Sequence, residues 1–179
     1  MPRRTSAGDL YTLTGGTGDV NPQFITFDVV QTGNDATTSE QIQLPIDRMS
    51  QRGGRAQIVE VLKVFFQVDF HEEGDTIQSL YLSTSSFGTT NTNWAEPRVF
   101  AAYILDKRLT TSGTFLTEGP FCMDLTDGAG HGYLIATDSI YAQLSSTGTS
   151  AANNCRVKIL YRWKNVGLSE YIGVVQSQS

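Results

Sequence analysis

Apolar and polar residues alternate in short runs along most of the chain, and turn-forming residues separate these runs. Alternation with a period of two places successive side chains on opposite faces of a β-strand. The pattern predicts strands over residues 24–31, 40–46, 57–70, 77–83, 99–105, 133–136, 140–144, 155–166 and 171–175, with short pieces at 115–116 and 121–125. Turns are predicted at 32–35, 74–75 and 106–108, where Gly, Asn, Asp or charged residues cluster.

The predicted strands, about eight to ten of them, have no long helix between them, and the loops that join them differ greatly in length. This pattern favours an all-β fold, namely a two-sheet antiparallel Greek-key sandwich or single jelly roll of about eight strands. Residues 23–179 are predicted to form this jelly-roll domain. Residues 1–22 are polar and glycine-rich, end at Asn21-Pro22, and are predicted to form an extended N-terminal arm.

The predicted strand over residues 155–166 is the most informative segment. One of its faces carries Val157, Ile159, Tyr161 and Trp163, which can pack into a core. Its other face carries Arg156, Lys158, Leu160, Arg162 and Lys164. Replacement of Arg162 and Lys164 is therefore expected to leave the fold intact. Trp163→Ala is expected to cost about 3–5 kcal/mol if the indole is fully buried.

The row of cations contrasts with the charge of the whole chain, which has a formal net charge of −5 over 179 residues. That length, with 39% hydrophobic residues, favours one domain with a hydrophobic core rather than a disordered chain. Two interpretations of the cation row are open. It follows the backbone of a nucleic acid, or it is a solvated face whose cations pair with acids on neighbouring strands.

The sequence also bears on location. Its N-terminus lacks the apolar segment of a secretory signal, and no apolar run approaches the length of a membrane-spanning helix. The two cysteines, Cys122 and Cys155, are expected to be reduced, with a single disulfide between them as the alternative. These features favour synthesis inside a cell and no membrane partner.

Motifs for catalysis are missing from the sequence. Its two histidines, His71 and His131, stand alone, without a second histidine at metal-ligand spacing. No nucleophile elbow, Walker loop or dinucleotide-binding fingerprint occurs. We therefore expect a protein that is not an enzyme.

Two acidic turns are candidates for a structural divalent cation, because calcium prefers oxygen-rich turns. One contains Glu72, Glu73 and Asp75, and the other contains Asp124 and Asp127. Neither matches the EF-hand pattern, and solvated turn acids are the favoured interpretation of both. We expect no cofactor beyond this candidate cation.

A tryptophan in a polar loop suggests a different function. Trp94 lies in the predicted loop over residues 84–96, where an exposed indole can stack on a sugar or a base, close the end of the sandwich, or anchor a subunit contact. Together with Tyr81 and Tyr103, it supports the alternative of a β-sandwich module that binds carbohydrate or a receptor.

Residues 161–178 read Tyr-Arg-Trp-Lys-Asn-Val-Gly-Leu-Ser-Glu-Tyr-Ile-Gly-Val-Val-Gln-Ser-Gln. This stretch resembles the C-terminal region of coat proteins from small circular single-stranded DNA viruses. The size, strand count and lack of helices resemble single jelly-roll coat proteins, including those of satellite viruses. The resemblance implies a viral capsid protein that self-assembles into a small icosahedral shell around a nucleic-acid genome. It implies a virion component that is made inside the host cell.

The resemblance also implies partners and a site. The partners would be other copies of the chain, single-stranded genomic nucleic acid and a host receptor. Many such coat proteins begin with a dense Arg/Lys arm, whereas this chain has only Arg3 and Arg4 there. The inner, nucleic-acid-binding face is therefore assigned to Arg156, Lys158, Arg162 and Lys164, together with Arg3 and Arg4.

Overall fold

The computed structural model describes residues 22–45, 55–68, 74–88, 90, 92–119 and 121–178. Its first strands are β1 (Gln23–Val30), β2 (Thr37–Gln43), β3 (Arg55–Val68), β4 (Thr76–Ser83) and β5 (Val99–Thr110). They are followed by β6 (Gly113–Gly119), β7 (Cys122–Asp124), β8 (Tyr133–Ile135), β9 (Ser139–Thr147), β10 (Asn154–Gly167) and the helix α2 (Leu168–Gln178). The predicted strands are confirmed, except for the one over residues 171–175.

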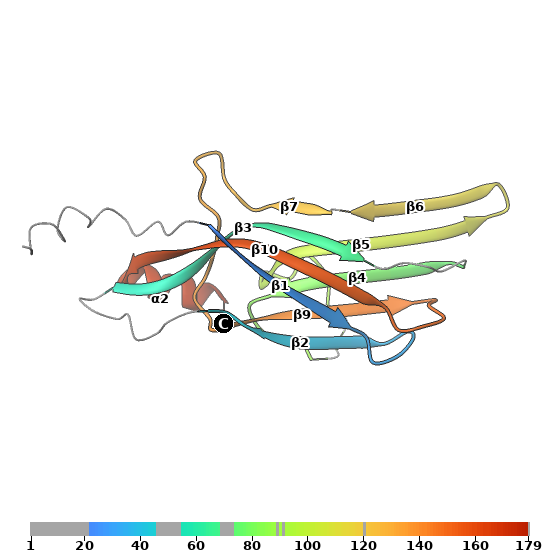
Figure 1. Ribbon diagram of the computed structural model, residues 1–179, viewed down its shortest axis with the longest axis horizontal. Helices are drawn as coiled ribbons and strands as arrows, with labels where there is room; N and C mark the ends of the chain where they lie inside the picture. The colour runs from blue at the N-terminus through green and yellow to red at the C-terminus, as the bar shows by residue number, and fades with distance from the viewer. Residues whose placement is uncertain are drawn as a thin grey trace, which may run out of the picture.

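The strands form two antiparallel sheets that lie face to face (Figure 1). In the first sheet the order is β1-β10-β3-β7, and β8 also pairs with β3. In the second sheet the order is β2-β9-β4-β5-β6. Strands that neighbour one another in space are mostly distant in sequence, as in a Greek key. The predicted two-sheet antiparallel sandwich is therefore confirmed.

The hydrophobic core lies between the sheets and draws on both of them. The rings of Phe66 on β3 and Tyr103 on β5 lie 5.9 Å apart, centroid to centroid, across the sandwich. Val157, Ile159 and Tyr161 on β10 are all buried in this core, with 0%, 1% and 4% of their surface exposed. Trp163 is only partly buried and packs against the edge of the core. The apolar face predicted for the strand over 155–166 is therefore confirmed.

A β-bulge in β3 fixes which residues of the first sheet face outward. Leu160 pairs with Lys63 and Tyr161 pairs with Val61, so Leu62 is the extra residue. Because the extra residue belongs to β3, the alternation along β10 continues unbroken. The even-numbered residues of β10 therefore all lie on the sheet face that points away from the core.

The C-terminal residues form α2, and the prediction of a strand over 171–175 without any long helix is wrong. β-branched residues in this segment favour a strand locally. However, Tyr171, Val174 and Val175 also have the spacing of one helix face. They pack in a second apolar cluster with Ala56, Ile58, Ala136 and Val166. This packing on the outer face of the first sheet outweighs the local strand preference, and Figure 1 shows α2 at one end of the sandwich.

The side chain of Gln178 joins α2 to the sheet. It is buried, accepts a hydrogen bond from the Ala136 N–H at 3.1 Å and donates one to the Leu134 carbonyl. Within the part of the chain that the structure describes, no helix has the length and apolar character needed to span a membrane.

The turn predicted at residues 106–108 is also wrong. β5 continues through Asp106, Lys107 and Arg108 to Thr110 and turns there into β6. Beyond Leu105 the hairpin is exposed or only partly buried. A strand that is wet on both faces tolerates consecutive charged residues, and for this reason the charge cluster did not mark a turn.

Candidate nucleic-acid interface

The four cations of β10 lie on one side of the first sheet, facing away from the core. We call this side the cation-bearing face. Arg156 and Lys158 are exposed, whereas Arg162 and Lys164 are partly buried. A single strand with an unbroken alternation is therefore enough to align all four, as the sequence predicts.

Strand pairing arranges the neighbours of these cations in rows across the sheet. One row contains Asp28, Arg156 and Gln67. The next contains Thr26, Lys158, Phe65 and Cys122, and a third contains Phe24, Leu160, Lys63 and Asp124. Cations, hydroxyl or amide groups and aromatic rings thus alternate over the middle of this face.

A hollow of about 240 Å³ lies in the middle of these rows. Thr26, Phe65, Gln67, Arg156 and Lys158 provide the outward-facing part of its lining. The Nζ of Lys158 lies 4.0 Å from the ring centroid of Phe24, whose side chain is 53% exposed. Exposed rings beside cations can stack on bases while the cations contact phosphates, so this arrangement suits a single-stranded nucleic acid.

The other two cations converge on one carboxylate. Glu60 on β3 is completely buried, and its Oε2 accepts a hydrogen bond from Nε of Arg162 at 2.5 Å. The Nζ of Lys164 lies 3.9 Å from Oε1 of Glu60, which also accepts the N–H of Gly132 at 3.0 Å. Arg162 and Lys164 therefore compensate a buried charge and are less available to a ligand than Arg156 and Lys158.

The environment of Glu60 keeps it ionised. Burial by itself would raise its pKa, but the hydrogen bonds from Arg162 and Gly132 and the charges of Arg162 and Lys164 together lower the pKa below the ordinary value. The carboxylate is thus part of the folded structure and does not act as a proton donor near neutral pH.

Ion pairs reduce the positive charge of this face without cancelling it. Arg156 pairs with Asp28 at 3.7 Å and Lys63 with Asp124 at 2.8 Å. Among the described residues of β1, β3, β7 and β10 on this face, five cations stand against three carboxylates, an excess of two positive charges. The interpretation as cations paired with acids on neighbouring strands therefore holds for Arg156, Arg162 and Lys164, and contact with a nucleic acid stays a prediction.

The remaining predicted site residues are not brought to this face. Arg3, Arg4, Glu72 and Glu73 lie outside the described residues. Asp75 accepts the N–H of Leu109, close to the turn of the β5–β6 hairpin. The other two acids proposed for a cation have partners in their own turns or on the paired strand.

Asp124 and Asp127 act as turn-forming acids. Asp124 accepts hydrogen bonds from the hydroxyl and N–H of Thr126, and Lys63 and Thr126 together lower its pKa. The backbone N–H of His131 is the main cause of the lowered pKa of Asp127. Within the described ranges, no three His, Cys, Asp or Glu side chains are grouped as metal ligands. The candidate cation stays a prediction, because Glu72 and Glu73, two of the candidate ligands in the first acidic turn, lie outside these ranges.

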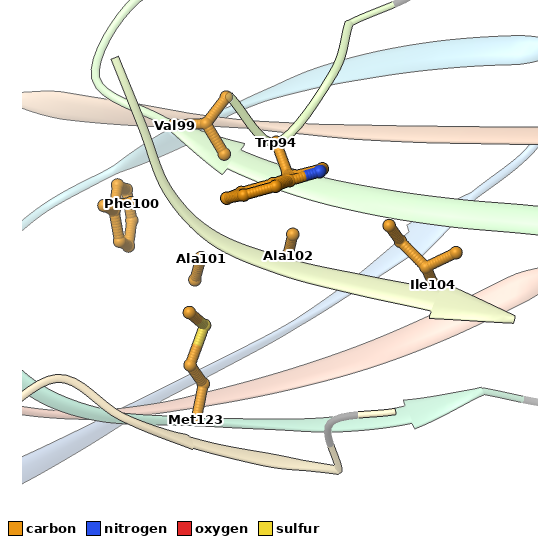
Figure 2. A pocket seen from close by; sticks show the side chains of 7 residues that line it. All are labelled: Trp94, Val99, Phe100, Ala101, Ala102, Ile104 and Met123. Carbon is orange, nitrogen blue, oxygen red and sulfur yellow. The ribbon is translucent and has the colours of Figure 1, made fainter. Parts of the chain in front are cut away.

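The three aromatic residues that suggest a carbohydrate-binding module differ in how exposed they are. Tyr81 and Tyr103 are buried, and Tyr103 donates a hydrogen bond to Glu118 at 2.9 Å. Trp94 is 69% exposed. Its indole lies over Ala102 beside a pocket of about 420 Å³, toward which Met123 points from β7 (Figure 2). Trp94 is thus the one residue of this group whose ring a ligand can reach.

Sequence reasoning missed Glu60, Phe24 and Phe65. Glu60 is the single acid in an otherwise apolar stretch of β3, which marks it as unusual. Its partner could not be identified without the strand order, which places β3 beside β10. Phe24 and Phe65 join the face for the same reason, through pairing with strands distant in sequence.

No protein-family model matches the chain, and no curated protein matches its sequence. Solved structures do match. A chain of the cryo-electron-microscopy structure of the Merkel cell polyomavirus virus-like particle gives a TM-score of 0.51 at 10% identity, over 93% of this chain and 81% of that one. The crystal structure of that particle gives 0.49 at 12% identity, over 94% and 81%. The pentamer of human polyomavirus 7 VP1 gives 0.49 at 9% identity, over 80% and 95%.

At this identity the likeness with a TM-score of 0.51 concerns the fold. Together with the strand order of the two sheets, it confirms the predicted single jelly roll.

Proposed function

We propose that this chain is a viral capsid protein, a single jelly-roll subunit that self-assembles into a small icosahedral shell around a nucleic-acid genome. The observation that best supports the proposal is the shared fold with a chain of a virus-like particle over 93% of this chain. The likeness of residues 161–178 to coat proteins of small circular single-stranded DNA viruses supports it independently. The role needs no catalytic group, and the chain is proposed not to be an enzyme.

The genome would contact the cation-bearing face. Arg156 and Lys158 are its exposed cations, and Phe24 and Phe65 offer rings beside them. Ring stacking requires bases that are not already stacked in a duplex, so the proposed ligand is single-stranded. With an excess of only two positive charges on the described part of this face, binding by this face is expected to be weak, and the slope of log affinity against log salt is expected to be small, about −1.4 for two phosphate contacts. Arg3 and Arg4 would add charge from the N-terminal arm.

Electron microscopy of the purified protein tests shell formation. Closed particles of one size that contain nucleic acid are the expected result. A protein that stays monomeric in images and in gel filtration across salt and pH would refute the proposed function.

A matched pair of variants tests the genome contact. Arg156→Gln removes one exposed cation from this face. Arg98→Gln removes one cation from the loop before β5, where it lies over the ring of Phe87 at 4.5 Å. For a single-stranded oligonucleotide, Arg156→Gln should reduce the slope of log affinity against log salt by about 0.7, the contribution of one phosphate contact. Arg98→Gln should leave the slope unchanged.

A third variant changes the charge of the cation-bearing face in the opposite direction. Asp28→Asn removes the acid that lies 3.7 Å from Arg156 and raises the positive charge of the face. It should increase both oligonucleotide affinity and the nucleic acid that copurifies with the particles. Equal slopes for Arg156→Gln and Arg98→Gln, with no gain in Asp28→Asn, would exclude this face as the genome contact.

A further inference from the structure

The β5–β6 hairpin exposes apolar side chains far from the core. Leu109, Phe115 and Leu116 are 47%, 72% and 55% exposed. Phe115 pairs with Arg108 and Leu116 with Lys107, so the two apolar side chains of β6 point to opposite faces of the sheet. β4 pairs with β5 as far as Lys107, and beyond that residue the hairpin is a two-stranded ribbon. Two-stranded ribbons are at best marginally stable alone in water, and exposed aromatic residues on one favour a protein contact.

A pocket lies at the other end of the same sheet edge. β5 pairs with β6 only from Ile104 onward, and no described strand covers its edge at residues 99–103. The pocket of about 420 Å³ opens there, between β5 and β7, and Trp94, Val99, Phe100, Ala101, Ala102, Ile104 and Met123 line it (Figure 2). The side chains that line it are apolar. It can therefore accept an apolar side chain.

The hairpin of one molecule cannot fill its own pocket. Phe115 pairs with Arg108, which stands four positions from Ile104 and eight positions from Phe100 in the same strand. At about 3.3 Å per strand residue, Phe115 lies about 13 Å from the near end of the pocket lining and about 26 Å from Phe100. Figure 1 shows the hairpin turn and the start of β5 at opposite ends of that strand.

We propose that the β5–β6 hairpin of one copy docks on the neighbouring copy, with Phe115 entering the pocket beside Trp94. The inference rests on the proposed function, because it names the contact through which the subunits would assemble. A protrusion and a cavity at different places on one molecule make a heterologous contact, which generates rings or closed shells when repeated.

Exposed apolar side chains lie on both sides of such a contact. On the hairpin, Phe115, Leu109 and Leu116 are 72%, 47% and 55% exposed. On the other side, Trp94 and Phe121 are 69% and 57% exposed. With about 150–250 Å² for each buried aromatic ring, these two rings offer about 190–315 Å², a large part of the about 450 Å² of non-polar area that each partner of a stable interface buries.

The charges of the hairpin do not oppose docking. Arg108 pairs with Asp106 at 2.7 Å, and Glu118 accepts the hydroxyl of Tyr103. Both of these charged groups thus have partners within the hairpin and its base. A second copy of the chain therefore fits this edge better than a strongly charged partner.

A disulfide trap between two preparations tests the contact. In a Cys122→Ser background, one preparation carries Phe115→Cys and the other carries Met123→Cys. Cys122 is exposed and must be removed, whereas Cys155 is buried and can stay. When equal amounts of the two are mixed under assembly conditions with diamide as the oxidant, up to about half of the chain should form a disulfide-linked dimer on a non-reducing gel, because a Phe115→Cys hairpin meets a Met123→Cys pocket at about one heterologous contact in four.

A matched partner controls for chance encounters. Val30→Cys, at a residue 50% exposed on the first sheet, replaces Phe115→Cys in the mixture. Its cross-linked yield with Met123→Cys should be at least tenfold lower. Similar yields for the two mixtures would overturn the proposed contact, even if wild-type shells form. In parallel, Phe115→Ser should lower the particle yield at least tenfold without changing the unfolding midpoint, and an unchanged particle yield would overturn it equally.

These outcomes separate the two proposals. Wild-type shells without the specific cross-link would refute the hairpin contact and leave the capsid proposal standing. A wild-type protein that forms no particles would refute the capsid proposal, and the cross-link would then decide by itself whether the hairpin binds a second copy.

Discussion

Replacement of Arg162 by methionine tests whether the Arg162–Glu60 pair is a buried ion pair or an ordinary surface one. Arg162→Met keeps most of the stem of the side chain and removes the charge. Glu60 is completely buried, so its carboxylate would keep only the Gly132 N–H and the more distant Lys164. Breaking a buried pair by removing one partner costs about 3–5 kcal/mol, whereas an exposed pair contributes at most about 1 kcal/mol.

Because Lys164 remains 3.9 Å from Glu60, we expect a loss near the lower end, about 3 kcal/mol. Urea unfolding of the unassembled subunit, followed by tryptophan fluorescence, measures it. With a slope of about 2 kcal/mol per molar urea, the midpoint should fall by about 1.5 M. The double variant Glu60→Gln with Arg162→Met should recover part of the loss, since no charge is then left buried without a partner.

Lys63→Met is the matched control, because the Lys63–Asp124 pair lies on the same face but is largely exposed. Its unfolding midpoint should stay close to that of the wild type. A loss below about 1 kcal/mol in Arg162→Met, similar to that of the control, would refute the view that this pair is buried and structurally required.

Three further predictions concern pH, a hydrogen bond and a turn. The pKa of Glu60 is lower in the folded chain than its ordinary value of 4.5. The ionised carboxylate therefore contributes fully to stability above pH 4.5, and this contribution is lost as the pH falls through the pKa of the folded chain. The stabilities of the wild type and Glu60→Gln should converge as the pH is lowered below 4.5, and a constant difference between them would contradict the lowered pKa. Trp163→Phe removes the hydrogen bond that Nε1 donates to the Pro45 carbonyl at 3.0 Å. It should lower the free energy of unfolding in urea by about 1 kcal/mol. A variant as stable as the wild type would show that this bond contributes nothing. Gly148 has a φ of +77°, and a Cβ there would lie 2.1 Å from the Asp75 carbonyl oxygen. Gly148→Ala should therefore lower the melting temperature, whereas Gly33→Ala, whose Cβ meets nothing within 4 Å, should not. Equal melting temperatures for the two variants would argue against this close approach.

The sandwich could be predicted because alternation along single strands determines it. The alternation in β10 places Val157 and Ile159 in the core and Arg156 and Lys158 outside, and no other strand is needed for that inference. The helix α2 could not be predicted in this way. Its apolar positions are stabilised by packing on Ala56 and Ile58 of β3, and this contact depends on the order of the strands.

The candidate site was predictable only in part, for the same reason. The sequence places Arg162 on the outer face, where its replacement is expected to leave the fold intact. It does not reveal that the bulge at Leu62 aligns Glu60 with Arg162. The expectation that variants of Arg162 and Lys164 spare the fold should therefore be replaced by the loss of stability described above. Arg156 and Lys158 are the better residues for testing nucleic-acid binding.

A cryo-electron-microscopy reconstruction of the purified particle tests the central claim most directly. We predict a closed shell of jelly-roll subunits in which the face that carries Arg156 and Lys158 lines the nucleic-acid cavity. A shell in which that face points to the exterior would contradict the proposed genome contact, and a purified protein that forms no shell would contradict the capsid function itself.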